Sequence, residues 1–338
     1  MSNAPDPIYS VENLCVRFPL AQPFSEMIAG KERPTVRAVD GVNFSIRRGE
    51  ILSLVGESGS GKSTIGKALL RLLDPKVITG SVCFEGKDVS TFSKTDLTTF
   101  RQRAQMIFQD PYQALNSKLS NFYQVAEPLY VNHLTKTKEE LYERVRVAMD
   151  QAGLRPPESY MGRFPHELSG GQRQRIAIAG AMVMNPDFLV ADEPVSMLDV
   201  SIRADILKLI VGLREERGVS CLFITHDLSL AWLISDRIAI LYLGKIMEIG
   251  KAEEIAANPL HPYTQSLLSI MPKLELRKEG KRELLSGEIP NPTEAPKGCR
   301  FSSRCPHAMK RCSEEEPAMS DSGEGHLAAC FLLDEKKA

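Results

Sequence analysis

The sequence predicts an α/β fold with a mainly parallel sheet. Three short apolar runs, residues 51–55, 188–191 and 221–225, are bounded by glycine, charged or polar residues, which is the pattern of strands buried on both faces. Segments with helical periodicity alternate with these runs, as expected when helices cover the faces of a sheet. The predicted helices are residues 62–73, 138–153 and 172–184.

Length and composition are those of a folded globular chain. The 338 residues suggest roughly two domains at about 150 residues each, and 43% of them are hydrophobic and 25% charged. The net charge of −1 gives no basic field, so a nucleic-acid partner is not expected. The polar start at residues 1–10 does not resemble a signal peptide, and no run approaches about 18 apolar residues, so any membrane role is expected to act through a partner.

The chain divides into a large amino-terminal domain and a smaller carboxyl-terminal extension. Residues 8–18 and 42–46 alternate as strands do, and residues 19–37 between them indicate an extended loop. A helix-rich stretch at about 112–185 predicts a subdomain inserted into the α/β core. Residues 1–255 are therefore assigned to the main domain, and the proline-rich residues 256–338 to the extension.

A glycine-rich loop joins the first buried strand to the helix that follows it. Residues 56–63 fit the pattern G-x-x-x-x-G-K-[ST], in which glycines let successive N–H groups face phosphate oxygens. The helix adds its N-terminus, a lysine adds charge, and a serine hydroxyl can bind Mg²⁺. A chance match is the alternative, but the position between strand and helix favours phosphate binding. The candidate nucleotide-binding residues here are Gly56, Glu57, Ser58, Gly59, Ser60, Gly61, Lys62, Ser63 and Thr64.

Two adjacent carboxylates follow the second buried strand. Asp192 is expected to hold Mg²⁺ through water, and Glu193 to polarise the water that attacks a γ-phosphate. The alternative is a solvated turn before Pro194. The phosphate loop at the same sheet edge favours the catalytic interpretation.

The decisive motif is Leu-Ser-Gly-Gly-Gln at residues 168–172, which resembles the signature motif of the ABC ATPases. A serine and two glycines before a helix form a second small anion-binding cap, although alone they more often form a plain helix cap. In a head-to-tail dimer this cap would complete the site that the partner's phosphate loop opens. The residues implied are Ser169, Gly170, Gly171 and Gln172.

The resemblance covers roughly residues 8–255 and implies further roles. Gln109 resembles the Q-loop glutamine, Asp199 the D-loop aspartate and His226 the switch histidine. Phe18 is the candidate for stacking on adenine, with Tyr9 as the rival. The implied catalytic residues are Glu193, His226, Lys62 and Gln109, and the implied Mg²⁺ ligands are Ser63, Gln109 and Asp192.

Three segments are similar to the oligopeptide/dipeptide importer ATPases, particularly their F-type subunits. They are residues 105–112, 261–264 and 298–306. The resemblance implies an ATPase that acts peripherally at the cytoplasmic face of the inner membrane. Its partners would be an identical or paralogous ATPase, two permease subunits and an external binding protein. Some relatives import nickel or oligosaccharides, so the cargo stays open.

Four of the seven cysteines lie near the end of the chain in the spacing C-x5-C-x6-C-x17-C. Without a secretory signal, clustered cysteines favour a metal over disulfides. Thiolates suit iron–sulfur and zinc alike, and the resemblance implies a [4Fe–4S] cluster; His307 and His326 keep zinc as an option, and free cysteines are the third alternative. The four are Cys299, Cys305, Cys312 and Cys330.

The sequence thus predicts an ATP-hydrolysing subunit that powers import. Two alternatives remain. A soluble, non-transport ABC ATPase would bring a coiled coil or tandem ATPase domains, which this sequence lacks. A regulatory module built around a metal bound by the carboxyl-terminal cysteines would not require all of the catalytic residues that this sequence carries.

Overall fold

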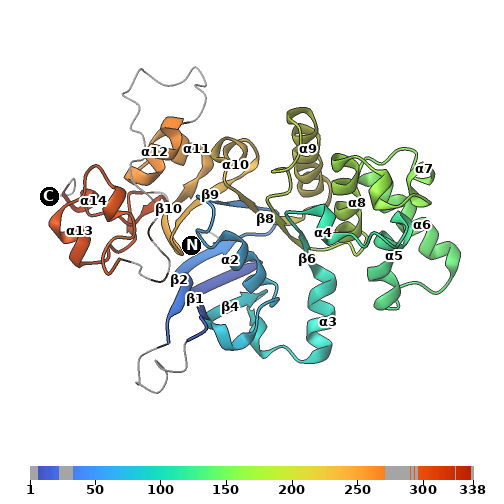
Figure 1. The fold of residues 1–338 in the computed structure, drawn as a ribbon, viewed down its shortest axis with the longest axis horizontal. Coiled ribbons are helices and arrows are strands. Elements are labelled where there is room, and N and C mark those ends of the chain that lie inside the picture. Colours follow the sequence, from blue (N-terminus) through green and yellow to red (C-terminus); the bar gives the residue numbers. More distant parts are fainter. Residues whose placement is uncertain are drawn as a thin grey trace, which may run out of the picture. The chain divides into compact units, whose positions relative to one another are not determined.

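The computed structural model describes residues 7–22, 33–270, 290, 293, 296–323 and 325–335. The chain forms two compact units, and it passes between them several times. Unit 1 comprises residues 1–8, 47–51 and 91–224, and unit 2 comprises residues 9–46, 52–90 and 225–338. Figure 1 shows the elements of both units coloured along the sequence.

Unit 1 contains three parallel strands and the helices between them. Strand β7 (Phe188–Asp192) lies between β6 (Ala104–Ile107) and β8 (Ser220–Thr225). The register pairs Ile107 with Ala191 and Asp192 with Ile224, so the carboxyl ends of all three strands reach the same level. Residues that follow these strands are therefore brought to one edge of the sheet.

The helices of unit 1 include a group that shares one apolar core. The helices are α3 (Lys94–Arg103), α4 (Pro111–Ala114), α5 (Asn121–Val131), α6 (Lys138–Gln151), α7 (Glu158–Met161), α8 (Gly170–Met182) and α9 (Val200–Arg217). Buried residues of α5, α6 and α8, among them Leu129, Met149 and Ile176, pack together. Their spacing of three or four residues places them on one face of each helix.

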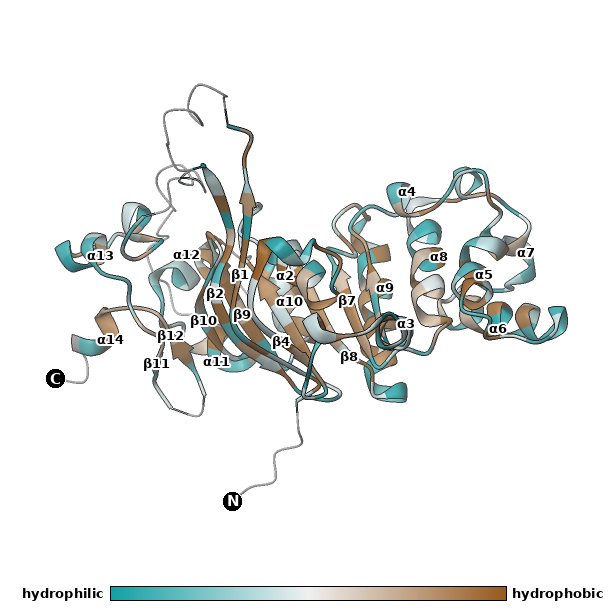
Figure 2. Cartoon of the chain, turned by 90° about the horizontal axis from the view of Figure 1, so that it is seen from below, coloured by the Kyte–Doolittle hydropathy of each residue, from teal (hydrophilic) through white to brown (hydrophobic). Residues whose placement is uncertain are grey.

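Unit 2 contains two sheets. The first is antiparallel, in the order β2 (Thr35–Ile46), β1 (Tyr9–Pro19), β4 (Ile78–Phe84) and β5 (Lys87–Asp88). In the second, β3 (Ile51–Val55) runs parallel to β9 (Arg237–Tyr242), and β10 (Lys245–Lys251), β12 (Leu327–Ala328) and β11 (Ser320–Asp321) follow antiparallel. Figure 2 shows β9 and β10 as mainly hydrophobic, as expected of strands within a core.

The helices of unit 2 pack against its two sheets and build its carboxyl-terminal part. They are α2 (Lys62–Leu69), α10 (Leu228–Ile234), α11 (Ala252–Ala257), α12 (Pro262–Ile270), α13 (Lys310–Glu314) and α14 (Leu332–Glu335). Short 3-10 helices lie at Pro75–Val77, Val89–Thr91, Pro165–Glu167 and Ser302–Arg304. Phe301, Cys312 and Phe331 share an apolar core with β9, β10 and α10 to α12. The last part of the chain therefore packs into unit 2.

The expected elements and the observed ones differ by one or two residues at several ends, as at α6 and α8, and differ more in three places. Helix α2 ends at Leu69 rather than residue 73, because Arg71 adopts a φ of 50° that no helix continues through. Strand β2 begins at Thr35, inside the expected loop 19–37, of which residues 23–32 lie outside the described part. The third difference is the antiparallel sheet of unit 2, because the sequence predicts mainly parallel pairing.

Within the described ranges, none of the helices combines the length and the apolar character that crossing a membrane requires.

Candidate nucleotide-binding site

The phosphate loop lies in unit 2 between the buried strand β3 and helix α2. Gly61 is the N-cap of α2, with a φ of 105°, and no side chain caps the helix there. A Cβ at Gly61 would lie 2.2 Å from the carbonyl oxygen of Ala38, so only glycine fits. The first N–H groups of α2 therefore have no side-chain acceptor at the cap and can serve an anion.

Lys62 is folded into this loop. Its Nζ donates to the carbonyl oxygens of Gly56 at 2.8 Å and Glu57 at 2.9 Å, and to Ser60 Oγ at 3.4 Å. The side chain is buried, so its charge is held against the loop rather than in solvent. A phosphate oxygen can replace these carbonyl contacts, because the ammonium group has three donors that reorient together.

Glu57, the second residue of the loop, is bound by residues far along the chain. Arg304 forms two hydrogen bonds with its carboxylate, and the Tyr263 hydroxyl accepts a hydrogen bond from its N–H. In the sequence analysis, residues 261–264 and 298–306 are used only for their family resemblance. No role is assigned there to Tyr263 or Arg304. A separation of more than 200 residues leaves no local signal for such contacts.

Unit 1 brings together Gln109 and Glu193. The parallel register of β6 and β7 places the residues that follow them side by side, and Gln109 Nε2 donates to Glu193 Oε2 at 3.0 Å. Glu193 has a φ of 44°, and its N–H donates to the carbonyl oxygen of Ile224 at 2.9 Å. Such a backbone is strained for a residue with a Cβ, as is common at functional sites. Asp192, one residue earlier, is buried.

The signature segment begins helix α8 in unit 1. Ser169 is the N-cap: its Oγ accepts from the N–H of Gln172 at 3.4 Å, and its own N–H donates to Gln172 Oε1 at 3.0 Å. A Cβ at Gly171 would lie 2.6 Å from the Ile202 side chain of α9. Asp199, the N-cap of α9, forms no capping hydrogen bond through its side chain and is exposed.

Three aromatic candidates occupy different environments in unit 2. Phe18 is half-buried near the end of β1, opposite Val36 of β2. Tyr9, the rival for adenine stacking, is fully buried, and its hydroxyl donates to the carbonyl oxygen of Leu69 at 3.2 Å. Burial excludes Tyr9 from contact with a base in this conformation. His226 is exposed and precedes Asp227, the residue that caps α10.

The four carboxyl-terminal cysteines line one small cavity of about 10 Å³. Burial, and to a lesser extent the charges of the other three thiols, raise the pKa of Cys299 to about 11. Burial likewise raises the pKa of Cys330 to about 11. These two thiols are thus neutral near pH 7 unless a cation is present. His307 also lines the cavity, whereas the ring of His326 is hydrogen-bonded to Glu248 at 2.8 Å.

No group of three or more His, Cys, Asp or Glu side chains in the described part of the chain is arranged to hold a metal ion. The cysteines share a cavity, but their sulfur atoms are not gathered into a ligand set.

Comparison with known families and structures identifies the fold. Residues 39–196 match the family described as ABC transporter, and residues 247–312 match the oligopeptide/dipeptide transporter, C-terminal region. The dimeric post-hydrolysis structure of the ATP-binding cassette MJ0796 with ADP and Pi has a TM-score of 0.62 and 28% identity, covering 72% of this chain and 98% of that one. The cbiO1 structure from Clostridium perfringens has a TM-score of 0.62 and 29% identity, over 75% and 92% of the chains. The fold is that of a P-loop ABC ATPase.

Relatives that match nearly the whole chain identify its family more narrowly. The putative oligopeptide transport ATP-binding protein YkfD of Bacillus subtilis is 46% identical over 90% of this chain and 92% of its own length. Oligopeptide transport ATP-binding protein AppF of the same organism is 47% identical, over 88% and 90%. Dipeptide transport ATP-binding protein DppF of Haemophilus influenzae is 42% identical, over 88% and 90%. The chain belongs to this family of ABC transporter ATP-binding proteins.

Proposed function

We propose that this chain binds ATP at the phosphate loop, hydrolyses it within a dimer, and thereby powers the import of oligopeptides or dipeptides. As a member of its family, the chain is an ATP-hydrolysing subunit of an ABC importer. The observation that carries the proposal is the phosphate loop itself. It combines a helix N-terminus that has no capping side chain with a lysine whose Nζ donates to the carbonyl oxygens of Gly56 and Glu57.

In unit 2 the loop residues and Lys62 are proposed to bind the phosphates, and Phe18 to stack on adenine. The family resemblance implies Ser63, Gln109 and Asp192 as Mg²⁺ ligands. They offer a hydroxyl, an amide oxygen and a carboxylate, which are the oxygen ligands that suit Mg²⁺. When bound, Mg²⁺ neutralises charge on the phosphates.

Glu193 is the proposed general base. Its backbone is fixed by the hydrogen bond to Ile224, and its carboxylate is held by Gln109, so the carboxylate can orient a water molecule with little loss of entropy. His226 is proposed to contact the γ-phosphate. Ser169 and the glycines that follow it are proposed to bind the γ-phosphate of the nucleotide held by the partner subunit, with Asp199 nearby on the same surface. Exposed apolar side chains at Met197 and Val200 support burial of this surface in a dimer.

The hydrolysis step is tested with Glu193→Gln, which keeps the size and the hydrogen-bonding groups of the side chain. We expect ATP turnover to fall by about 10²- to 10⁴-fold while ATP binding persists, and the dimer to accumulate with ATP. Glu216→Gln, at an exposed glutamate of α9, is the matched control and should turn over ATP normally. Equal activity of the two variants would remove Glu193 from the mechanism.

Transport requires partners that the chain meets at a membrane. We propose that it acts peripherally at the cytoplasmic face of the inner membrane, with two permeases, an external binding protein, and an identical or paralogous ATPase. Phe108 and Tyr112, which flank Gln109, are exposed aromatic residues suited to a permease surface. Peptide-stimulated ATP turnover in a reconstituted transporter would support this assignment. Stimulation by nickel or oligosaccharides instead would assign another cargo.

Two finer features of the architecture belong to the same proposal. The helices α5, α6 and α8, within residues of about 112–185, are proposed to form the subdomain that passes ATP-driven closure to the permeases. Their common apolar core supports movement as one body. The boundary between the main domain and the extension near residue 255 remains a prediction.

We further propose that Cys299, Cys305, Cys312 and Cys330 hold a [4Fe–4S] cluster, with zinc as the alternative. The shared cavity and the raised pKa values of Cys299 and Cys330 support this proposal, because four thiolates can coexist only around a cation. When bound, the cluster would crosslink the segment that joins α12 to α14. The metal content and visible absorption of anaerobically purified protein should both be lost in Cys305→Ser and kept in Cys83→Ser, a cysteine of β4. Zinc in place of iron would establish the alternative.

A further inference from the structure

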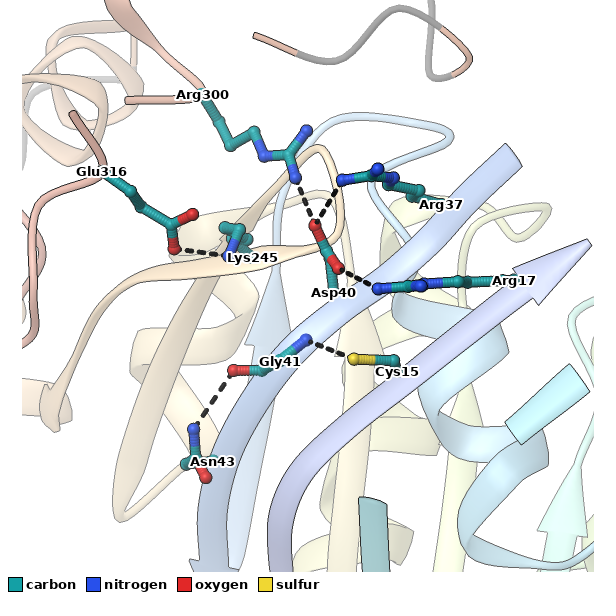
Figure 3. A network of polar contacts seen from close by, with 9 residues as sticks. All are labelled: Cys15, Arg17, Arg37, Asp40, Gly41, Asn43, Lys245, Arg300 and Glu316. Atoms are coloured by element: carbon teal, nitrogen blue, oxygen red, sulfur yellow. Dashed lines mark hydrogen bonds and ion pairs between the residues drawn. The ribbon is translucent and has the colours of Figure 1, made fainter. Parts of the chain in front are cut away.

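The segment 299–305, which carries the first two cysteines, is attached to the nucleotide-binding part of unit 2 through two arginines. Arg300 follows Cys299 and forms a buried ion pair with Asp40 of β2. Arg17 and Arg37 approach the same carboxylate at 3.5 and 3.8 Å, as Figure 3 shows. Arg300 is only 3% exposed, so this attachment is internal rather than a surface contact.

Arg304 forms the second attachment, directly to the phosphate loop. Its Nη1 donates to Glu57 Oε2 at 2.8 Å and its Nη2 to Glu57 Oε1 at 3.1 Å, which is the two-pronged geometry of a strong arginine–carboxylate pair. Nη1 also donates to the Tyr242 hydroxyl at 3.2 Å. Arg304 is 8% exposed, so the pair is largely shielded from solvent and from salt.

The backbone of Glu57 is held as firmly as its side chain. Tyr263 of α12 accepts from its N–H at 3.2 Å, and its carbonyl oxygen accepts from Lys62. The rings of Tyr242 and Tyr263 each pack against Phe301, with centroid distances of 5.4 and 5.2 Å. These rings immobilise the groups that hold Glu57, so the loop residue is fixed at its carboxylate, N–H and carbonyl oxygen.

We propose that Arg304 is a positioning residue of the ATP site, which sets the phosphate loop through Glu57 and couples the cysteine-lined segment to nucleotide binding. This inference rests on the proposed function of the loop. Glu57 is the one acidic residue among residues 56–63, and the loop receives a triphosphate. Without Arg304 the carboxylate would lose its neutralising partner and would repel the incoming anion.

The test is a double-substitution cycle that measures the dissociation constant for MgATP on the full chain. Arg304→Met should weaken MgATP binding about tenfold in the wild-type background. In the Glu57→Gln background, which has no carboxylate to neutralise, the same substitution should change the constant less than about twofold. Arg304→Lys keeps the charge but loses the two-pronged pair. Its dissociation constant for MgATP should therefore lie between those of the wild type and Arg304→Met. Arg311→Met is the matched control, because Arg311 contacts Glu315, Asp334 and Phe331 within the carboxyl-terminal part.

The outcomes separate this inference from the proposed function. A wild-type chain that does not bind MgATP would contradict the function of the loop itself. Wild-type binding with the same loss in both Glu57 backgrounds, or with no loss in either, would overturn the positioning role. If Arg304→Met does not fold in the wild-type background, Arg304→Lys carries the same comparison. A circular dichroism melting curve for each variant distinguishes loss of ATP binding from loss of the fold.

Discussion

Helices α2 and α8 both begin at a glycine-rich turn, but their N-termini are in different states. At α2 the N-cap is Gly61, which has no side chain to cap the helix. At α8 the N-cap is Ser169, which forms a reciprocal pair of hydrogen bonds with Gln172. The first N-terminus has no capping side chain, whereas the second is closed by its own side chains.

This difference indicates an order of binding. In the proposed function, the phosphates of ATP meet a helix start whose N-cap has no side chain. The signature segment of the partner subunit would give up an internal hydrogen bond before it contacts a γ-phosphate. We expect nucleotide to bind each subunit first and the dimer to close afterwards. The next four predictions test this comparison from the largest effect to the smallest.

Gly61→Ala should abolish measurable ATP binding, with a loss of about 100-fold or more, because the methyl group would collide with backbone at a φ that alanine avoids. Equilibrium binding of a fluorescent ATP analogue measures the loss. Gly59→Ala provides the comparison: Gly59 also has a positive φ, but its Cβ would meet no atom within 4 Å, so the loss should be smaller. Equal losses would show that backbone strain, not collision, governs the loop.

Gly171→Ala should lower ATP turnover about tenfold while leaving ATP binding by the single subunit intact, because its methyl group meets a side chain rather than backbone. Ile202→Ala in the same chain removes that side chain and should restore most of the turnover. Turnover and binding are measured on the same preparations. Failure of Ile202→Ala to restore activity would mean that the Gly171 backbone itself is required, as at Gly61.

A third helix start, at α12, is closed by a group that titrates. His261 Nδ1 accepts from the N–H of Tyr263 at 3.0 Å, and burial lowers the pKa of His261 to about 4. The folded protein binds its proton less readily than the unfolded chain. The contribution of His261 to the free energy of unfolding is therefore fully present above its unfolded pKa of about 6.5. It is lost as the pH falls towards 4, by up to about 1.4 kcal/mol per pH unit.

Urea unfolding at pH 7.5 and pH 5.5 measures this effect, with His261→Asn as the reference because asparagine keeps an acceptor without titrating. The wild type should lose more stability than the variant on acidification. The same loss in both proteins would assign the pH dependence to other groups.

Ser169→Ala should have the smallest effect on folding, a loss of about 1 kcal/mol or less in the free energy of unfolding, because it removes a single long cap bond. Chemical denaturation measures it. Binding of ATP by the single subunit should not change, since the open N-terminus of α2 is untouched. A weakened affinity there would contradict the proposed order of binding.

The parts of the site that lie in continuous segments could be predicted from the sequence, and the parts that join distant segments could not. Strand β3 spans the predicted residues 51–55, and the Gly61 turn follows from spacing alone. The contact of Gln109 with Glu193 follows once the strands are known to be parallel. The pair of Arg304 with Glu57 spans 247 residues, and no periodicity or motif encodes it.

Hydrophobic periodicity also fails to predict an element that is too short to show a repeat. Strands β11 and β12 contain two residues each, so no alternation marks them. Their existence depends on β10, whose edge supplies the hydrogen bonds. Proline-rich composition predicts an appendage here, and it gives no sign that part of the segment completes a sheet.

The pairing of β12 with β10 has a consequence for how the chain behaves at high concentration. An exposed β10 would offer a row of unpaired backbone groups to any other chain in the cell. Strand β12 occupies that edge, and the outermost strand β11 is two residues long and carries Asp321, which discourages further pairing. The described carboxyl-terminal strands therefore protect this edge of the sheet against edge-to-edge aggregation.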